Sequence, residues 1–235
     1  MSFFVLQPAE LDALLLTLRV TCVGLVVALP LAVAVAYVLA RYRFPGHGVL
    51  NALIHLPLVM PPVVTGYLLL LAFGRKGPIG SLLSDWFGVS VAFTWEGAAL
   101  AAGVMAFPLI VRPIRLSFEA IDPKLEQAAA ALGTRTGIAF LVITLPLALP
   151  GILGGAILGF AKAMGEFGAT ITFVSNIPGE TRTLSLALYT AIQSPGGEMP
   201  ALRLTLISAA VAFAALILSE LWARKLRARL AGADA

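Results

Sequence analysis

The sequence predicts an all-α polytopic membrane protein, because apolar runs of membrane-spanning length recur along it and charge is scarce. Of its 235 residues, 60% are hydrophobic and 12% are charged, whereas soluble domains carry about 25% charged residues. A helix needs roughly 20 apolar residues to cross the hydrocarbon core. We therefore expect five transmembrane helices, with six as the alternative, in a single transmembrane domain that covers residues 1–235.

The five spans are expected at residues 12–40, 50–74, 96–116, 146–173 and 202–223. The segment 89–93 is apolar but too short to add a sixth. Lys and Arg gather after the first span, after the third, and after the fifth, where they are Arg224, Lys225, Arg227 and Arg229. The positive-inside rule makes that side cytoplasmic, so the N-terminus is expected outside and the C-terminus inside. This topology also explains the net charge of +4, and no nucleic-acid partner is expected.

The second expected span contains three prolines in the stretch LPLVMPPVVTGYLLL at 56–70. Proline removes a backbone donor and interrupts a helix. Irregular backbone survives in a membrane only where it is buried in protein or lines a cavity. Two interpretations stay open: a kink that serves packing, or a pathway lined by Pro61, Pro62, Thr65 and Gly66.

The loop after the third span, about residues 117–139, contains a short helix between two clear signals. Asp122-Pro123 is a start signal, an N-cap acceptor followed by proline at the first helical position. Gly133 suits the left-handed residue that ends a helix. The alanine-rich stretch between them predicts about ten helical residues, roughly 15 Å. Such a helix either docks a cytoplasmic partner, with Glu126 offering it a charge, or lies on the membrane surface.

The fourth span is too long for one straight helix. Residues 138–173 are apolar for 36 residues, about 54 Å as a helix, against a hydrocarbon core of about 30 Å. We expect the span either to start late or to bend, with Pro146 and Pro150-Gly151 as the natural break points. Lys162 and Glu166 lie four residues apart, so they share a helix face and can neutralise each other. The pair is either structural or part of a gate or pathway.

The outer loop, about residues 174–200, contains two turn-rich stretches, NIPGETR at 176–182 and QSPGGEM at 193–199. Turns rich in Gly and Pro are typical of surface connections. This loop is either an ordinary connection or a docking surface.

The sequence lacks the motifs of catalytic and metal sites. It has no GxxxxGK[ST] phosphate loop, no HExxH and no paired cysteines. His47, His55 and Cys22 are isolated from one another. We therefore expect a non-catalytic chain with no metal site and no cofactor of its own.

Several motifs together resemble the permease subunits of ABC importers. The order of Glu126-Gln127-Ala128-Ala129, Gly133, Phe140 and Leu145-Pro146 resembles the coupling motif of that family, whose usual second residue is alanine rather than Gln127. The strings GEFGATITFVSNIPGETRT at 165–183 and PPVVTGYLLL at 61–70 are similar to the molybdate branch. The resemblance covers nearly the whole chain.

The resemblance implies the type I importer permease fold, in the cytoplasmic (inner) membrane of a prokaryote and in contact with its lipid. It implies a homodimer that translocates molybdate, and also tungstate, with two cytoplasmic ATPase subunits that bind ATP and Mg. An extracytoplasmic molybdate-binding protein would deliver the oxyanion. The residues implied in coupling to the ATPase are Glu126, Gln127, Ala128, Ala129, Leu132, Gly133 and Arg135.

Two further groups of residues take roles from this resemblance. The binding protein would be received by Asn176, Glu180, Arg182 and Glu198. Within the pathway, Lys162 can attract the oxyanion. The hydroxyls of Thr170 and Thr172 can donate hydrogen bonds to it, or they can satisfy backbone groups instead.

Three alternatives remain. A sulfate-type oxyanion permease shares the GEFGA string, but such permeases usually form heterodimers. An ion-coupled secondary carrier would use Lys162 and Glu166 as its coupling pair and would need no ATPase. A non-transporting scaffold would bind an ATPase and move nothing.

Overall fold

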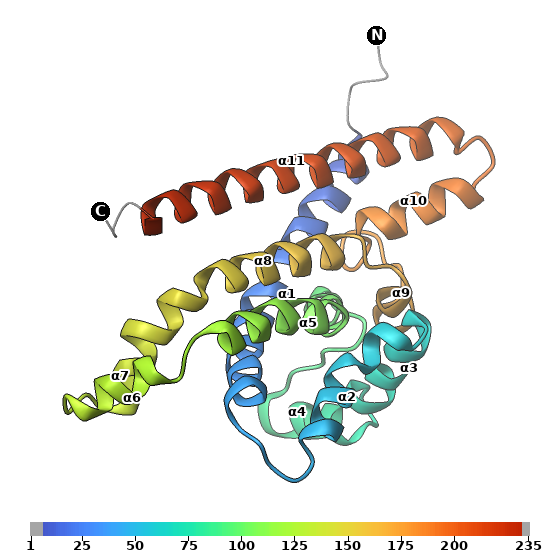
Figure 1. Cartoon of the computed structure of the whole chain (residues 1–235). Helices are drawn as coiled ribbons and strands as arrows, with labels where there is room; N and C mark the ends of the chain where they lie inside the picture. Colours follow the sequence, from blue (N-terminus) through green and yellow to red (C-terminus); the bar gives the residue numbers. More distant parts are fainter. Residues whose placement is uncertain (1–6, 232–235) are drawn as a thin grey trace.

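The structure is a computed structural model that describes residues 7–231, apart from the side chains of 219–220 and 222–231, and the regular secondary structure of this part is all helical (Figure 1). The helices in chain order are α1 (Pro8–Arg41), α2 (His47–Val59), α3 (Pro62–Phe73), α4 (Pro78–Phe87), α5 (Trp95–Ala120), α6 (Lys124–Ala131), α7 (Thr136–Ala139), η1 (Phe140–Thr144), α8 (Leu145–Met164), α9 (Gly168–Val174), α10 (Leu184–Gln193) and α11 (Glu198–Ala231).

Four stretches of the described chain are long and apolar enough to cross a membrane, or five if the bent pair α2–α3 counts as one span. This confirms the expected all-α polytopic class. Residues 89–93 form no helix, so they add no further span. The short helix α4 lies in a segment expected to be a loop.

Helix α5 forms the centre of the molecule, and 67% of its most apolar stretch is buried. Gly24 of α1 allows a close approach to α5, because a Cβ added there would lie 2.6 Å from the carbonyl oxygen of Ala99. On its other side, α5 packs against α8, where a Cβ at Gly155 would lie 2.7 Å from the carbonyl oxygen of Ile110. The helices α1, α5 and α8 therefore form one tightly packed unit.

The expected span 50–74 is not a single helix. Helices α2 and α3 meet at an angle of 117°, and Met60 and Pro61 connect them in extended conformations. The three prolines do interrupt the helix, as expected from their missing donors. They turn the chain so sharply that α3 packs beside α9 rather than continuing the line of α2.

The fourth span also differs from the prediction. The chain runs as one helical stretch from Thr136 to Met164, with the π-helical turn η1 directly before Pro146 and with Pro150 inside α8. Proline has no backbone N–H, so one carbonyl of the preceding turn lacks its usual donor, and the wider π-helical turn accommodates this gap. The helix breaks at residues 165–167 instead, and α9 begins at Gly168.

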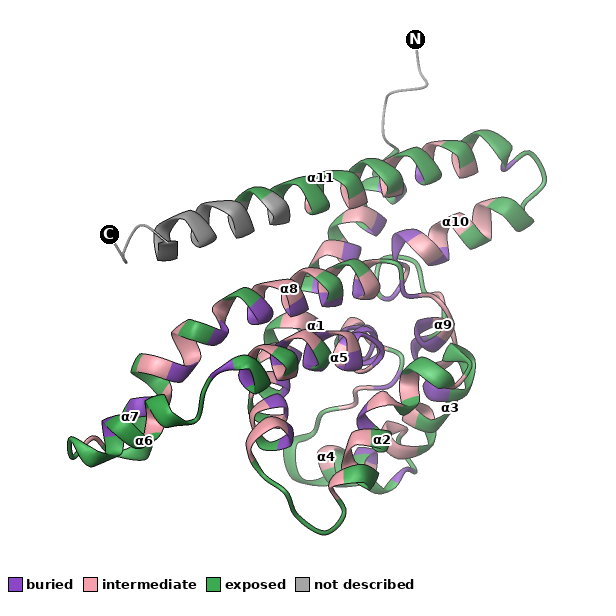
Figure 2. Cartoon of the chain, viewed as in Figure 1, coloured by how far each residue is buried: buried purple, intermediate pink, exposed green. Residues whose placement is uncertain are grey.

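Helix α11 lies across the outside of α8 and α10 in Figure 1. Only 6% of its apolar stretch is buried (Figure 2). The side chains of Arg224, Lys225, Arg227 and Arg229, used for the predicted topology, lie outside the described residues.

Candidate functional site

Helices α6 and α7 project from one end of the molecule, at the lower left of Figure 1. Asp122 caps the start of α6, because its Oδ1 accepts a hydrogen bond from the Lys124 backbone N–H at 2.9 Å. Gly133 ends the helix with φ +85°, a conformation that suits glycine. The amide of Thr134 closes the turn on the carbonyl of Ala129 at 3.0 Å. Gly133 therefore follows the end of the helix as expected, whereas α6 begins at Lys124 with Pro123 at its N-cap, one residue later than predicted, and has eight residues rather than about ten.

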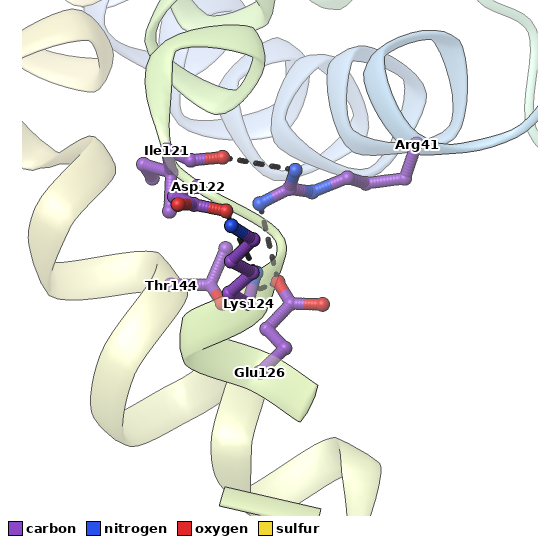
Figure 3. A network of polar contacts seen from close by, with 6 residues as sticks. All are labelled: Arg41, Ile121, Asp122, Lys124, Glu126 and Thr144. Atoms are coloured by element: carbon purple, nitrogen blue, oxygen red, sulfur yellow. Dashed lines mark hydrogen bonds and ion pairs between the residues drawn. The ribbon is translucent and has the colours of Figure 1, made fainter. Parts of the chain in front are cut away.

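The carboxylate of Glu126 points into the protein (Figure 3). Its Oε1 accepts a hydrogen bond from Thr144 Oγ1 at 2.6 Å and lies 3.4 Å from Arg41 Nη2. Arg41, at the end of α1, also donates from Nη1 to the carbonyl of Ile121 at 3.1 Å. The side chains of Arg41 and Glu126 are only 12% and 22% exposed. Glu126 thus ties α6 to α1 and to η1, and its expected contact with a partner stays a prediction.

Most of the remaining surface of α6 is exposed. Leu132 is 88% exposed, and the other exposed members of the predicted docking set are Gln127, Ala128, Gly133 and Arg135. Ala129 is buried against the rest of the chain. An exposed leucine beside small side chains suits a helix that fits into a groove of another protein. The docking role of this set stays a prediction.

A cavity of about 420 Å³ lies between the end of α1 and α6, with Arg41 and Glu126 in its wall. Tyr37 lines it too, and its ring packs edge-to-face against Phe118 and Phe140. These ring contacts hold Tyr37 in place in the wall of the cavity.

The pair expected inside the fourth span is formed. Lys162 Nζ lies 2.6 Å from Glu166 Oε2, and Glu166 Oε1 accepts a hydrogen bond from the Ala169 backbone N–H at 3.0 Å. Glu166 is buried and Lys162 is partly exposed. The carboxylate thus caps the N-terminus of α9, where the helix dipole also stabilises a negative charge. This explains why the helix breaks here rather than at a proline.

The second-span motif packs directly against α9. A Cβ at Gly66 would lie 2.5 Å from the carbonyl oxygen of Ala169, and a Cβ at Gly168 would lie 2.7 Å from Pro62 Cβ. Thr65 is buried beside this contact and its hydroxyl has no hydrogen-bond partner. Pro61 is exposed and precedes α3. The structure therefore brings together two motifs that lie about a hundred residues apart in the sequence.

The two threonines of α9 differ in their surroundings. Thr170 is 1% exposed. The Thr172 hydroxyl donates to the carbonyl of Gly168 at 2.9 Å, the backbone role that was one of its two expected roles.

The outer loop is held by a short network. Asn176 Nδ2 donates to Thr190 Oγ1 at 2.8 Å, and its Oδ1 accepts from Arg182 Nε at 2.9 Å. Glu180 and Glu198 are exposed. Asn176 and Arg182 are therefore brought together, whereas Glu198 begins a different helix, α11.

Sequence reasoning missed three residues of these sites. Arg41 is one of the basic residues after the first span and Thr144 belongs to no motif, so neither indicates a contact with Glu126, which lies 85 residues from Arg41 and 18 from Thr144. Arg19 lies inside the first apolar span, which is a visible signal. Its Cζ is 3.6 Å from the centroid of the Trp95 ring. Among the described residues there is no cluster of three metal-ligating side chains.

Comparison with known proteins places these features in context. Residues 28–228 match the family described as "Binding-protein-dependent transport system inner membrane component". The "Molybdenum transport system permease protein ModB" of Escherichia coli strain K12 is 55% identical over 225 residues, 96% of this chain and 98% of that protein. The protein of the same name from Haemophilus influenzae is 53% identical, over 94% of this chain and 96% of its own.

A solved structure shares the fold. The crystal structure of a bacterial ABC transporter involved in the import of the acidic polysaccharide alginate superposes with a TM-score of 0.75 at 15% identity. The match covers 94% of this chain and 80% of that one. At this identity the likeness concerns the fold, and it confirms the expected importer permease architecture.

Proposed function

Because this chain belongs to the family of inner membrane components of binding-protein-dependent transport systems, we propose that it is the permease subunit of an ABC importer for molybdate. It is a multi-pass protein of the inner membrane. The choice of substrate is supported by the 55% identity to a molybdenum transport permease over 98% of that protein. Molybdate is the proposed form because it is the oxyanion expected from the resemblance, and tungstate has the same shape and charge.

The partners follow from the two ends of the molecule. Two cytoplasmic ATPase subunits, which bind ATP and Mg, dock on the exposed face of α6 with Leu132 at its centre. The extracytoplasmic binding protein docks near the opposite end, where Asn176 and Arg182 hold the outer turn. This chain pairs with a second copy, with the pathway between them. The N-terminus lies outside and the C-terminus inside, in agreement with the positive-inside rule.

Coupling starts from the contacts of Glu126. Movement of the ATPase shifts α6, and the Glu126–Arg41 pair transmits that shift to α1. The bond between Thr144 and the same carboxylate transmits it to η1 and α8. One carboxylate therefore joins the docking helix to two membrane helices.

The gate lies where α8 breaks. Glu166 is neutralised by Lys162 and by the N-terminus of α9, so a passing dianion meets a balanced charge rather than a bare carboxylate. Since α9 packs tightly on α3, the two short helices move together when the gate opens. Lys162 keeps part of its side chain exposed and is the cation available to the anion.

The test is ATP-dependent uptake of radiolabelled molybdate by vesicles that contain this chain, its ATPase and its binding protein. The variant Glu126→Ala/Gly133→Pro should abolish uptake, because it breaks the coupling contact and places proline where φ is +85°. Gly137→Ala, at an exposed glycine of α7 with open space around it, is the matched control. Tungstate should compete and sulfate should compete weakly.

The outcomes separate the alternatives. Uptake that persists without the ATPase would contradict the proposal and indicate an ion-coupled carrier, whose transport would collapse with an uncoupler. Stronger competition by sulfate than by molybdate would indicate a sulfate-type permease. ATPase binding without uptake of any oxyanion would indicate a scaffold.

A further inference from the structure

Arg19 is a charged residue in an apolar helix, eleven residues after the start of α1. A charge within a membrane-spanning helix is costly, and such residues usually mark functional sites or ion pathways. None of the salt bridges in the described part of the chain includes Arg19. Its guanidinium lies over the Trp95 ring, with Cζ 3.6 Å from the ring centroid. A stacked guanidinium keeps its N–H groups along its edge, available to an anion.

Arg182 reaches the same region from the outer loop. Its Nε donates to Asn176 Oδ1 at 2.9 Å, and Asn176 is held in turn by Thr190 at 2.8 Å. This bond fixes the direction of the side chain through Nε and leaves the two Nη groups for another acceptor. Arg182 is half-buried, so its position is set by the fold rather than by solvent.

Both arginines line one cavity of about 400 Å³. Its floor and walls come from α1, and the turn containing Pro178 and Gly179 closes its outer side. Asp12 is the only carboxylate among the lining residues, so the cavity carries two positive charges and one negative charge. It lies at the end of the molecule opposite α6, where the anion enters in the proposed function.

We propose that this cavity is a binding site for a small divalent tetrahedral oxyanion, held between Arg19 and Arg182 before it reaches the gate. The proposal rests on the proposed function and adds a site to it. Two guanidinium edges match the oxygens of such an anion. Asp12 offsets part of the attraction, which keeps binding reversible and lets the anion move on. An acidic side chain of the binding protein is the competing occupant, and the experiment distinguishes the two.

The experiment uses Trp95 as a reporter, because it touches Arg19 directly. The chain has three tryptophans, so Trp86→Phe and Trp222→Phe leave Trp95 as the only one. The permease–ATPase complex in nanodiscs is titrated with molybdate and, separately, with sodium chloride at equal ionic strength. We expect a saturable fluorescence change with molybdate alone. Arg182→Gln should raise the half-saturating concentration roughly tenfold to hundredfold, as for a lost charge-assisted hydrogen bond.

The controls decide how the result is interpreted. Arg75→Gln removes an exposed arginine that does not line the cavity, and it should leave the titration unchanged. Absence of a saturable change, or equal half-saturation in Arg182→Gln, would overturn the proposal. If Arg182→Gln instead weakens binding of the binding protein while the molybdate titration is unchanged, the arginines hold an acidic side chain. Molybdate uptake by the same unsubstituted complex shows separately whether the proposed function holds.

Discussion

The contact between Arg41 and Glu126 is expected to carry the coupling between α6 and α1, and Arg41→Ala removes it. The substitution takes away the 3.4 Å ion pair and the 3.1 Å bond to the carbonyl of Ile121. A hydrogen bond to a charged group contributes about 1.5–3 kcal/mol. Glu126 keeps its bond to Thr144 and is 22% exposed. We therefore expect Arg41→Ala to lower the free energy of unfolding by about 2 kcal/mol, in the lower half of this range.

The assay measures molybdate imported per ATP hydrolysed in proteoliposomes. Arg41→Ala should lower this ratio severalfold while the complex still assembles and hydrolyses ATP, because α6 can move without pulling α1. Arg43→Ala, an exposed arginine just beyond the end of α1, is the matched control. Thermal unfolding in detergent shows whether the variant is folded.

A double-mutant cycle isolates the pair from other effects. Arg41→Ala, Glu126→Ala and the double variant should be non-additive by about 1–2 kcal/mol in unfolding free energy. Thr144→Val removes the other bond to the same carboxylate at nearly constant shape and should also lower the transport ratio. An unchanged ratio in Arg41→Ala, together with additive single effects, would refute the assignment of Arg41 to coupling.

Three other results are expected. Gly66→Ala should destabilise the protein by about 1–3 kcal/mol in thermal unfolding, since its Cβ would lie 2.5 Å from a backbone oxygen of α9; Gly154→Ala, with open space around it, should have little effect. Glu166→Gln should reduce uptake and stability together, because it leaves Lys162 unpaired, and unchanged uptake would contradict a gate role. Leu132→Asp should weaken pull-down of the ATPase without lowering the unfolding temperature, and loss of both would point to a folding defect.

Local signals in the sequence predicted local structure well. The span lengths follow from the apolar runs, and the ends of α6 follow from Asp122 and Gly133, whose conformations depend on a few neighbouring residues. The prolines of the second span correctly predicted an interruption. They did not predict the 117° turn, because its angle depends on how α3 packs against α9.

Features that depend on distant partners were not predictable. The break at residues 165–167 is the exception, because it depends on local contacts: Glu166 caps α9 and pairs with Lys162, four residues away. The inward direction of Glu126 depends on Arg41, 85 residues away. Arg19 is different, since a charge inside an apolar run is visible in the sequence, but its stacking partner is not.

The links between α1 and the last third of the chain have a consequence for biosynthesis. The Thr17 hydroxyl donates to Ala13 O at 2.6 Å and accepts from the Leu184 amide at 2.8 Å, 167 residues later. Glu10 likewise pairs with Arg203, 193 residues later. Helix α1 thus waits for its partners in α10 and α11, which are synthesised later. The bond from Thr17 to its own helix keeps that hydroxyl satisfied during the wait, so α1 can enter the membrane early without an unpaired donor.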